Sequence, residues 1–156
     1  MYKFENGFSL LELLIVITIV VLLASIGIGY YLNYGKSVEI NSSAQIIVFD
    51  LKQVQSKAMI GEGGYKWGIH FVNPLGTAKD YYEIFSTGTD YSTSPTIIST
   101  NYLPSSATFN SPGDNSSTDI IFSKISGSAT AASVAITSFG FIKTIDVSSI
   151  GIISIQ

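Results

Sequence analysis

The residue whose type and position most need a chemical reason is Glu12, a carboxylate at the start of a long apolar run. Residues 13–32 carry no charge. At about 1.5 Å of helical rise each they reach roughly 30 Å, the thickness of the hydrocarbon core of a bilayer. A carboxylate at membrane depth costs about 2.5–3.5 kcal/mol on insertion scales, and less near the interface. We therefore expect Glu12 to have a specific role.

The rest of the chain offers little for catalysis. His70 is the only histidine and cysteine is absent, so a histidine-based metal site or a nucleophilic triad would depend on that one residue. We expect His70 to be an outward residue of a strand. The sequence has no GxxxxGK[ST] loop that would bind nucleotide phosphates. We expect no enzymatic activity and no cofactor.

Three acids in or beside polar loops, Asp90, Asp114 and Asp119, are the remaining candidates for a metal site. Their carboxylates could hold a calcium ion, but their spacing is not that of an EF-hand loop. Solvated loop acids are the default interpretation, so we expect no bound metal.

The order Gly-Phe-Ser-Leu-Leu-Glu over residues 7–12, followed by an aliphatic helix, resembles the processing site of type IV prepilins and type II secretion pseudopilins. The resemblance implies that a prepilin peptidase cuts between Gly7 and Phe8, that the new amine of Phe8 is N-methylated, and that Glu12 assists assembly. Gly7 has no side chain, which lets an extended backbone enter a narrow cleavage site. In a stack of subunits, Glu12 could pair with the amine of a neighbouring Phe8 and so favour correct register.

Two simpler interpretations of the apolar run remain open. An ordinary secretory signal could be cut at the small-x-small site Gly27-Ile28-Gly29, and a plain signal anchor would not be cut. Against a secretory signal, Lys3 is offset by Glu5, and the run is longer than the usual 7–15 residues.

The charge composition argues against a nucleic-acid partner. The net charge is −3, with eight lysines and no arginine, and 12% of the residues are charged. No basic patch supports binding of nucleic acid, although the relatives include competence pilins that bind DNA. Because cysteine is absent, the chain also lacks the disulfide that closes the C-terminal region of many major pilins.

Beyond residue 32 the chain becomes more polar, but a helical pattern continues. Apolar residues recur at spacings of four and three and so form one stripe, namely Ile40, Ala44, Ile47, Leu51, Val54 and Ala58. We expect one helix from about Leu10 to Met59, ended by the glycines at 61, 63 and 64. The stripe needs a partner, and a sheet is the simplest one.

From Tyr65 the pattern is typical of strands separated by turns. The first strand should have an inner face of Tyr65, Trp67, Ile69 and Phe71. A turn at residues 73–76 leads to a second strand at 81–86 and closes a hairpin. Residues 105–118, rich in Ser, Asn, Gly and Pro, are expected to be connecting turns. Further strands are expected at residues 96–102, 119–124, 133–142, 144–147 and 150–155.

These elements predict an α+β fold, in which a long N-terminal helix, half membrane-spanning and half amphipathic, packs on an antiparallel β-sheet head as in pilins. We expect a leader at residues 1–7, a transmembrane and assembly helix at 8–32, and an extracytoplasmic head at 33–156. The head would contain the amphipathic helix at 36–60 and strands over 65–156. The order of elements resembles the H-type minor pseudopilins and FimT-like minor pilins.

The resemblance implies a structural minor pilin or pseudopilin. It would be held in the cytoplasmic (inner) membrane as a single-pass protein, with its N-terminus in the cytoplasm, and then join a pilus or a type II secretion filament. The implied partners are other pilin or pseudopilin subunits, the prepilin peptidase and methyltransferase, an inner-membrane assembly platform and the lipid bilayer. The alternative is a membrane-anchored adhesin or binding domain that does not polymerise.

Overall fold

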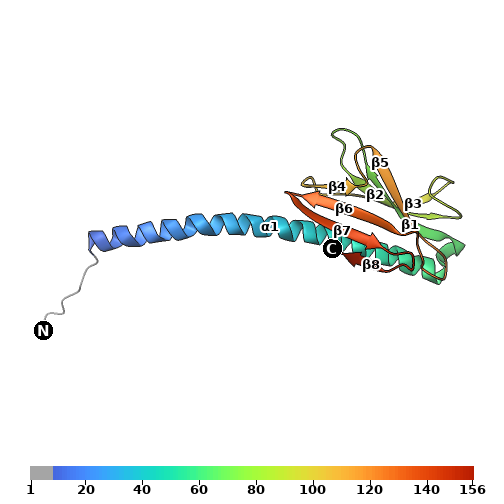
Figure 1. Ribbon diagram of the computed structural model, residues 1–156, viewed down its shortest axis with the longest axis horizontal. Helices are drawn as coiled ribbons and strands as arrows, with labels where there is room; N and C mark the ends of the chain where they lie inside the picture. The colour runs from blue at the N-terminus through green and yellow to red at the C-terminus, as the bar shows by residue number, and fades with distance from the viewer. Residues whose placement is uncertain (1–8) are drawn as a thin grey trace. The chain divides into compact units, whose positions relative to one another are not determined.

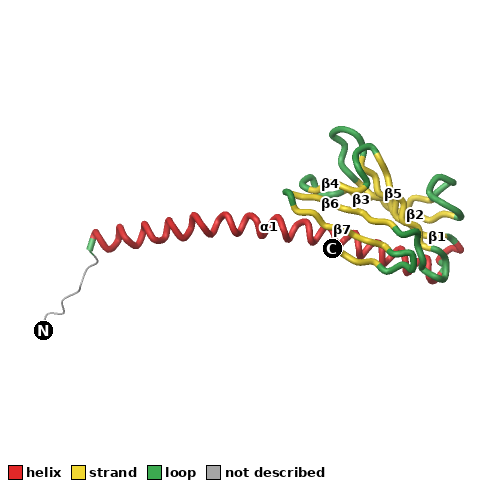
Figure 2. Tube along the Cα trace, viewed as in Figure 1, coloured by secondary structure: helices red, strands yellow, loops and turns green. Residues whose placement is uncertain are grey.

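The computed structural model describes residues 9–156, except for the side chains of residues 26–30 and 32. The chain begins with α1 (Leu10–Ile60), followed by the 3-10 helix η1 (Glu62–Gly64) and eight strands (Figures 1 and 2). Its contacts divide the chain into two compact units, Met1–Lys36 and Ser37–Gln156, and the boundary lies within α1. The second unit, which contains the strands, is called the head below.

The helix has almost the predicted bounds. The backbone N–H of Leu13 donates to the carbonyl of Ser9 at 3.1 Å, which makes Ser9 the residue before the first turn. At the other end Gly61 adopts φ 68°, in the left-handed region, and its N–H donates to the carbonyl of Ala58 at 3.0 Å. Because glycine adopts this conformation without the steric penalty of a Cβ, Gly61 ends the helix as its type predicts.

Sheet A has four antiparallel strands in the order β3-β2-β1-β5. They are β1 (Lys66–Asn73), β2 (Tyr81–Thr87), β3 (Thr96–Tyr102) and β5 (Ser116–Phe122). The predicted hairpin is confirmed as β1 and β2, and β3 has the predicted bounds. The strand predicted at 119–124 begins three residues earlier, because the register with β1 extends to the pair of Asn73 and Ser116.

Sheet B also has four antiparallel strands, in the order β4-β6-β7-β8. They are β4 (Ala107–Ser111), β6 (Ala132–Ser138), β7 (Phe141–Val147) and β8 (Ile153–Ile155). The single strand predicted at 133–142 is wrong, because Phe139 and Gly140 adopt φ 51° and 84° and turn the chain between β6 and β7. Two successive positive φ values are typical of a tight hairpin turn.

Three further expectations need correction. The segment 105–118 was expected to be connecting turns, but it contains all of β4 and the first residues of β5. The strand predicted at 150–155 is limited to β8, because the segment before it turns through Gly151 at φ 85°. Tyr65 was expected on the inner face of the first strand, yet it is 50% exposed, because β1 begins only at Lys66.

The apolar stripe of α1 forms one wall of the core. All six of its residues are at most 2% exposed, and they belong to one cluster with residues of both sheets. Where the sheets meet, the rings of Phe71 on β1 and Phe109 on β4 pack edge to face, with centroids 5.7 Å apart. The predicted α+β fold is confirmed, with two sheets on the helix.

Leu51→Asp tests this packing, because it places a charge at a stripe position that is 0% exposed. In a fragment of residues 33–156, we expect a loss of about 3–5 kcal/mol in the free energy of unfolding, since the buried carboxylate would have no partner. Lys52→Asp, one residue on and exposed, is the matched control and should change stability little. Denaturant unfolding of both variants measures the difference, and equal losses would contradict the packing of the stripe.

Candidate functional site

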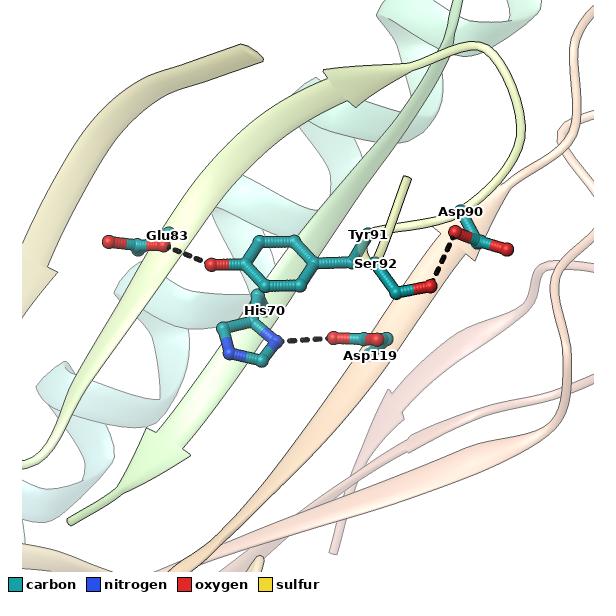
Figure 3. A network of polar contacts seen from close by, with 6 residues as sticks. All are labelled: His70, Glu83, Asp90, Tyr91, Ser92 and Asp119. Carbon is teal, nitrogen blue, oxygen red and sulfur yellow. Dashed lines mark hydrogen bonds and ion pairs between the residues drawn. The ribbon is translucent and has the colours of Figure 1, made fainter. Parts of the chain in front are cut away.

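His70 faces away from the helix, as its alternation with Ile69 and Phe71 predicts, but its side chain is only 12% exposed. It lies on β1 between Glu83 of β2 and Asp119 of β5, its direct partners in the sheet register. Its Nδ1 is bonded to a carboxylate oxygen of Asp119. The ring of Tyr91 stacks on the imidazole with centroids 3.7 Å apart and planes 8° apart (Figure 3).

Tyr91 fixes the loop between β2 and β3 over this histidine. Its hydroxyl donates to Oε2 of Glu83 at 2.6 Å, and Oε1 of Glu83 accepts from the hydroxyl of Thr100 at 3.3 Å (Figure 3 shows the first of these bonds). Burial, and then the bond to the Glu83 carboxylate, raise the pKa of Tyr91 above its ordinary value. The bonds of His70 to Asp119 and of Thr100 to Glu83 connect neighbouring strands, and the bond of Tyr91 connects the loop to β2, which indicates a structural role.

A second polar cluster holds β4 and the loop after it. Asn73 is 5% exposed, and its amide nitrogen donates to the carbonyls of Phe109 at 3.0 Å and Pro112 at 3.1 Å. Asp80, 6% exposed, accepts the backbone N–H of Phe109 at 2.5 Å. Burial raises the pKa of Asp80, the bond from Phe109 opposes this rise, and the charge of Asp114 adds to it.

The three acids considered for calcium have separate partners. Asp119 bonds to His70, Asp90 accepts the hydroxyl of Ser92 at 2.8 Å, and Asp114 lies 3.5 Å from the amide of Asn73. The hydroxyl of Ser92, and that of Thr93, lower the pKa of Asp90. Within residues 9–156, apart from the undescribed side chains, no group of three or more acidic, histidine or cysteine side chains could hold a metal ion.

Of the residues predicted for cleavage and assembly, Gly7 and Phe8 lie outside the described residues, and Glu12 lies in the first turn of α1 with its side chain exposed. Ser9 and Glu12 have the S-x-x-E spacing of a capping box. A carboxylate in the first turn also interacts favourably with the helix dipole, by about 0.3–1 kcal/mol. Sequence reasoning did not use this S-x-x-E spacing, although it was visible.

The first half of α1 has no partner within the described chain. Every described side chain from residue 10 to residue 25 is exposed, and the exposure of the large apolar ones ranges from 49% at Ile15 to 84% at Leu10. The hydroxyls of Thr18 and Ser25 donate to backbone carbonyls one turn earlier, both at 2.8 Å. An apolar surface of this size indicates an interaction with something outside the chain, and these hydroxyls would need no outside partner there.

A comparison with known protein families also singles out the N-terminal segment of the chain. Residues 2–28 match the family described as the prokaryotic N-terminal methylation motif. The chain carries a pilin-type prepilin signal. The match includes Gly7, Phe8 and Glu12 and ends before the head. No curated protein and no solved structure matches the chain. Among the residues whose side chains the structure describes, no helix is long and apolar enough to cross a membrane.

The raised pKa of Asp80 predicts how the stability of the head depends on pH. An acid whose pKa is higher in the folded state stabilises the fold below its unfolded pKa of about 3.9, and this contribution is lost as the pH rises through the folded pKa. Asp80→Asn keeps an acceptor for the N–H of Phe109 and removes the charge. We therefore expect its unfolding midpoint to match that of the unmodified chain near pH 3.5 and to be equal or higher at pH 7.

Asp90→Asn is the matched control. The pKa of Asp90 is lowered, so its effect on the pH dependence of stability has the opposite sign to that of Asp80. Its stabilising contribution is present above the unfolded pKa and is lost as the pH falls through the folded pKa. This variant should be less stable than the unmodified chain at pH 7 and should converge with it in acid. Thermal unfolding from pH 3 to pH 7 compares the variants, and a lower midpoint for Asp80→Asn at pH 7 would contradict the assignment.

Proposed function

We propose that the chain is a structural minor pilin or pseudopilin, processed after Gly7 and assembled through its N-terminal helix into a type IV pilus-like or type II secretion filament. The methylation motif over residues 2–28 carries this proposal. It continues into α1, whose exposed apolar first half needs surroundings that the chain itself does not supply. The order of helix and strands is similar to that of the H-type minor pseudopilins and FimT-like minor pilins, which is the subgroup we favour.

Processing would create the charge that Glu12 needs. Cleavage between Gly7 and Phe8 frees an amine four residues before Glu12, one helical turn or about 6 Å away. The side chain of Glu12 is exposed, so it is open to the amine of a neighbouring subunit. Leaving either charge unpaired in an apolar bundle costs several kcal/mol, more than Glu12 contributes to its own helix start. The pair would therefore select the correct register of neighbouring subunits.

Storage in the membrane and assembly would use different parts of the chain. Residues 8–32 would hold the subunit in the inner membrane as a single pass, with the N-terminus in the cytoplasm. The head has its own core of helix stripe and two sheets, which supports its remaining folded while the subunit moves from membrane to filament. The energy source would lie outside this chain, and the partners would be other pilin or pseudopilin subunits, the prepilin peptidase and an inner-membrane assembly platform.

The proposed role involves no catalysis, no cofactor and no metal in the head. The bond of His70 to Asp119 resembles part of a catalytic triad, but a triad also needs a nucleophile bonded to the imidazole. Among the described residues the hydrogen bond of His70 is to Asp119, and the Tyr91 ring covers one face of the imidazole. Both contacts support the view that His70 fastens the sheet.

Gly7→Val tests the cleavage site. A β-branched side chain restricts the extended backbone and crowds the cleavage subsite, so the chain should stay at precursor mass in the membrane. Gly7→Ala, which adds one methyl group, is the matched control and should be processed more than the valine variant. Mass spectrometry of the unmodified chain should show a methylated Phe8 at the N-terminus. An uncut Met1, or a cut near Gly29, would favour the non-polymerising anchored domain instead.

Glu12→Gln separates maturation from assembly. The amide keeps the shape and is cheaper to bury than an ionised carboxylate, so cleavage after Gly7 and membrane insertion should be normal. Incorporation into the filament should fail, because the incoming amine would find no opposite charge.

The measurement for this variant is crosslinking to the major subunit in cells, together with the mass of the mature chain. Glu12→Asp, which keeps the charge, is the control and should retain part of the crosslinking. Normal crosslinking of Glu12→Gln would remove the carboxylate from assembly or place this subunit at the very tip of the filament.

A further inference from the structure

The four edge strands of the head differ in how well they are protected against pairing with another strand. Unpaired edges are normally blocked by shortness, charge, proline or irregular register. In sheet B, β8 has three residues, and β4 has five, with a register shift beside β6 and Pro112 directly after it. In sheet A, β5 carries Asp119 and is closed at its end by a bridge between Phe122 and Ala129.

The remaining edge, β3, has less protection. It runs for seven residues without a charge. Its one irregularity is a register shift against β2 at Ile98, and residues 99–102 pair regularly. Over the described chain, no backbone group of residues 96–102 forms a hydrogen bond outside the ladder with β2. Ile97, Ile98 and Tyr102 are 49%, 52% and 65% exposed.

We propose that β3 pairs antiparallel with β3 of a second copy of this chain, so that two A sheets become one continuous sheet. A partner of the open edge must have an extended backbone, because only an extended segment can pair with the alternate N–H and C=O groups along a strand. The inference goes beyond the filament subunit proposed above and does not depend on polymerisation.

The absence of charge on β3 favours a second copy over an unrelated strand. Twofold pairing places each residue opposite the same residue or a near neighbour in sequence, so a charged strand would meet its own charge. The carboxylate of Glu83, on the adjacent strand, is already bonded to Tyr91 and Thr100. The pair would cover the exposed side chains of Ile97, Ile98 and Tyr102 in both copies.

The contact is small, because only one strand from each copy takes part. Stable interfaces bury about 1,200–2,000 Å², more than two seven-residue strands provide. The pairing should therefore be weak in dilute solution. It would become significant where copies are held close together, because a shared surface raises their effective concentration.

The absence of cysteine from the chain makes disulfide mapping a direct test. Directly opposite residues in antiparallel strands have Cα atoms about 4.5–5.5 Å apart, within the range a disulfide bridges. We would introduce Ile97→Cys, Ser99→Cys and Asn101→Cys singly into the full chain and oxidise it in membranes. Ser133→Cys is the control, because Ser133 is exposed on β6, an inner strand of sheet B.

We expect the yield of disulfide-linked dimer to peak within β3, roughly tenfold above the Ser133→Cys control. A single maximum places the twofold axis at that residue, because only a residue on the axis faces its own copy, and equal yields at two neighbouring positions place the axis at the residue between them. Equal yields at all three positions, or yields no higher than the control, would overturn the pairing and leave the edge open to a different strand.

A charge swap provides an independent test in the cysteine background with the highest yield. Where the maximum lies at residue 97 or 99, the two copies of Ile98 are opposite or diagonal neighbours across the pair, so Ile98→Lys should lower the dimer yield roughly fivefold by like-charge repulsion. For a maximum at residue 101 the same swap is made at Thr100, which then has this position. Mixing the lysine chains with chains that carry glutamate at the same position should restore the yield. The control Ile150→Lys, at a 70% exposed position in the loop before β8, should have no effect. Unchanged yield in the lysine variant of β3, or no recovery on mixing, would refute the pairing.

Discussion

Burial of one face of α1 against both sheets is the contact on which the head depends. The stripe from Ile40 to Ala58 lies in the same cluster as residues of sheet A and sheet B, so losing it would expose the inner faces of both. Hydrogen bonds from α1 also hold two of the connections between strands. The amide of Gln55 donates to the carbonyls of Gly127 at 3.0 Å and Gly151 at 2.7 Å, and so ties the connections β5–β6 and β7–β8 to the helix.

The two halves of α1 are suited to different surroundings. The head half buries one face, and its other face carries polar residues such as Gln45, Lys52 and Ser56, which are exposed. The first half presents apolar side chains and buries none of those described from residue 10 to residue 25. Because the core of the head uses only the second half, a change in what surrounds the first half need not alter the packing of the head. The proposed transfer of the subunit from membrane to filament would require such independence.

The sequence predicted the helix and its stripe because both depend on local periodicity. It missed β4, since Thr108 and Asn110 give that segment a polar character, and its pairing partner β6 lies over twenty residues further along the chain. The turn at Phe139 and Gly140 was missed because the apolar pattern runs straight through it, and only the positive φ values separate the two strands. The division of the strands into two sheets likewise depends on pairings between distant segments.

The candidate sites differ in predictability for the same reason. Gly7, Phe8 and Glu12 are close in sequence, so their pattern can be recognised without any fold, and the family match covers it. The row of Thr100, Glu83, His70 and Asp119 crosses four strands in exact register, and no spacing along the chain indicates it.

Two bonds to Glu83 of this row also position the edge strand β3. Since Glu83 holds both Thr100 and the loop residue Tyr91, β3 is fastened to β2 at its centre and at the loop before it. The outer edge of β3 is therefore a firmly positioned surface, and a pairing strand would lose little additional backbone entropy on the β3 side.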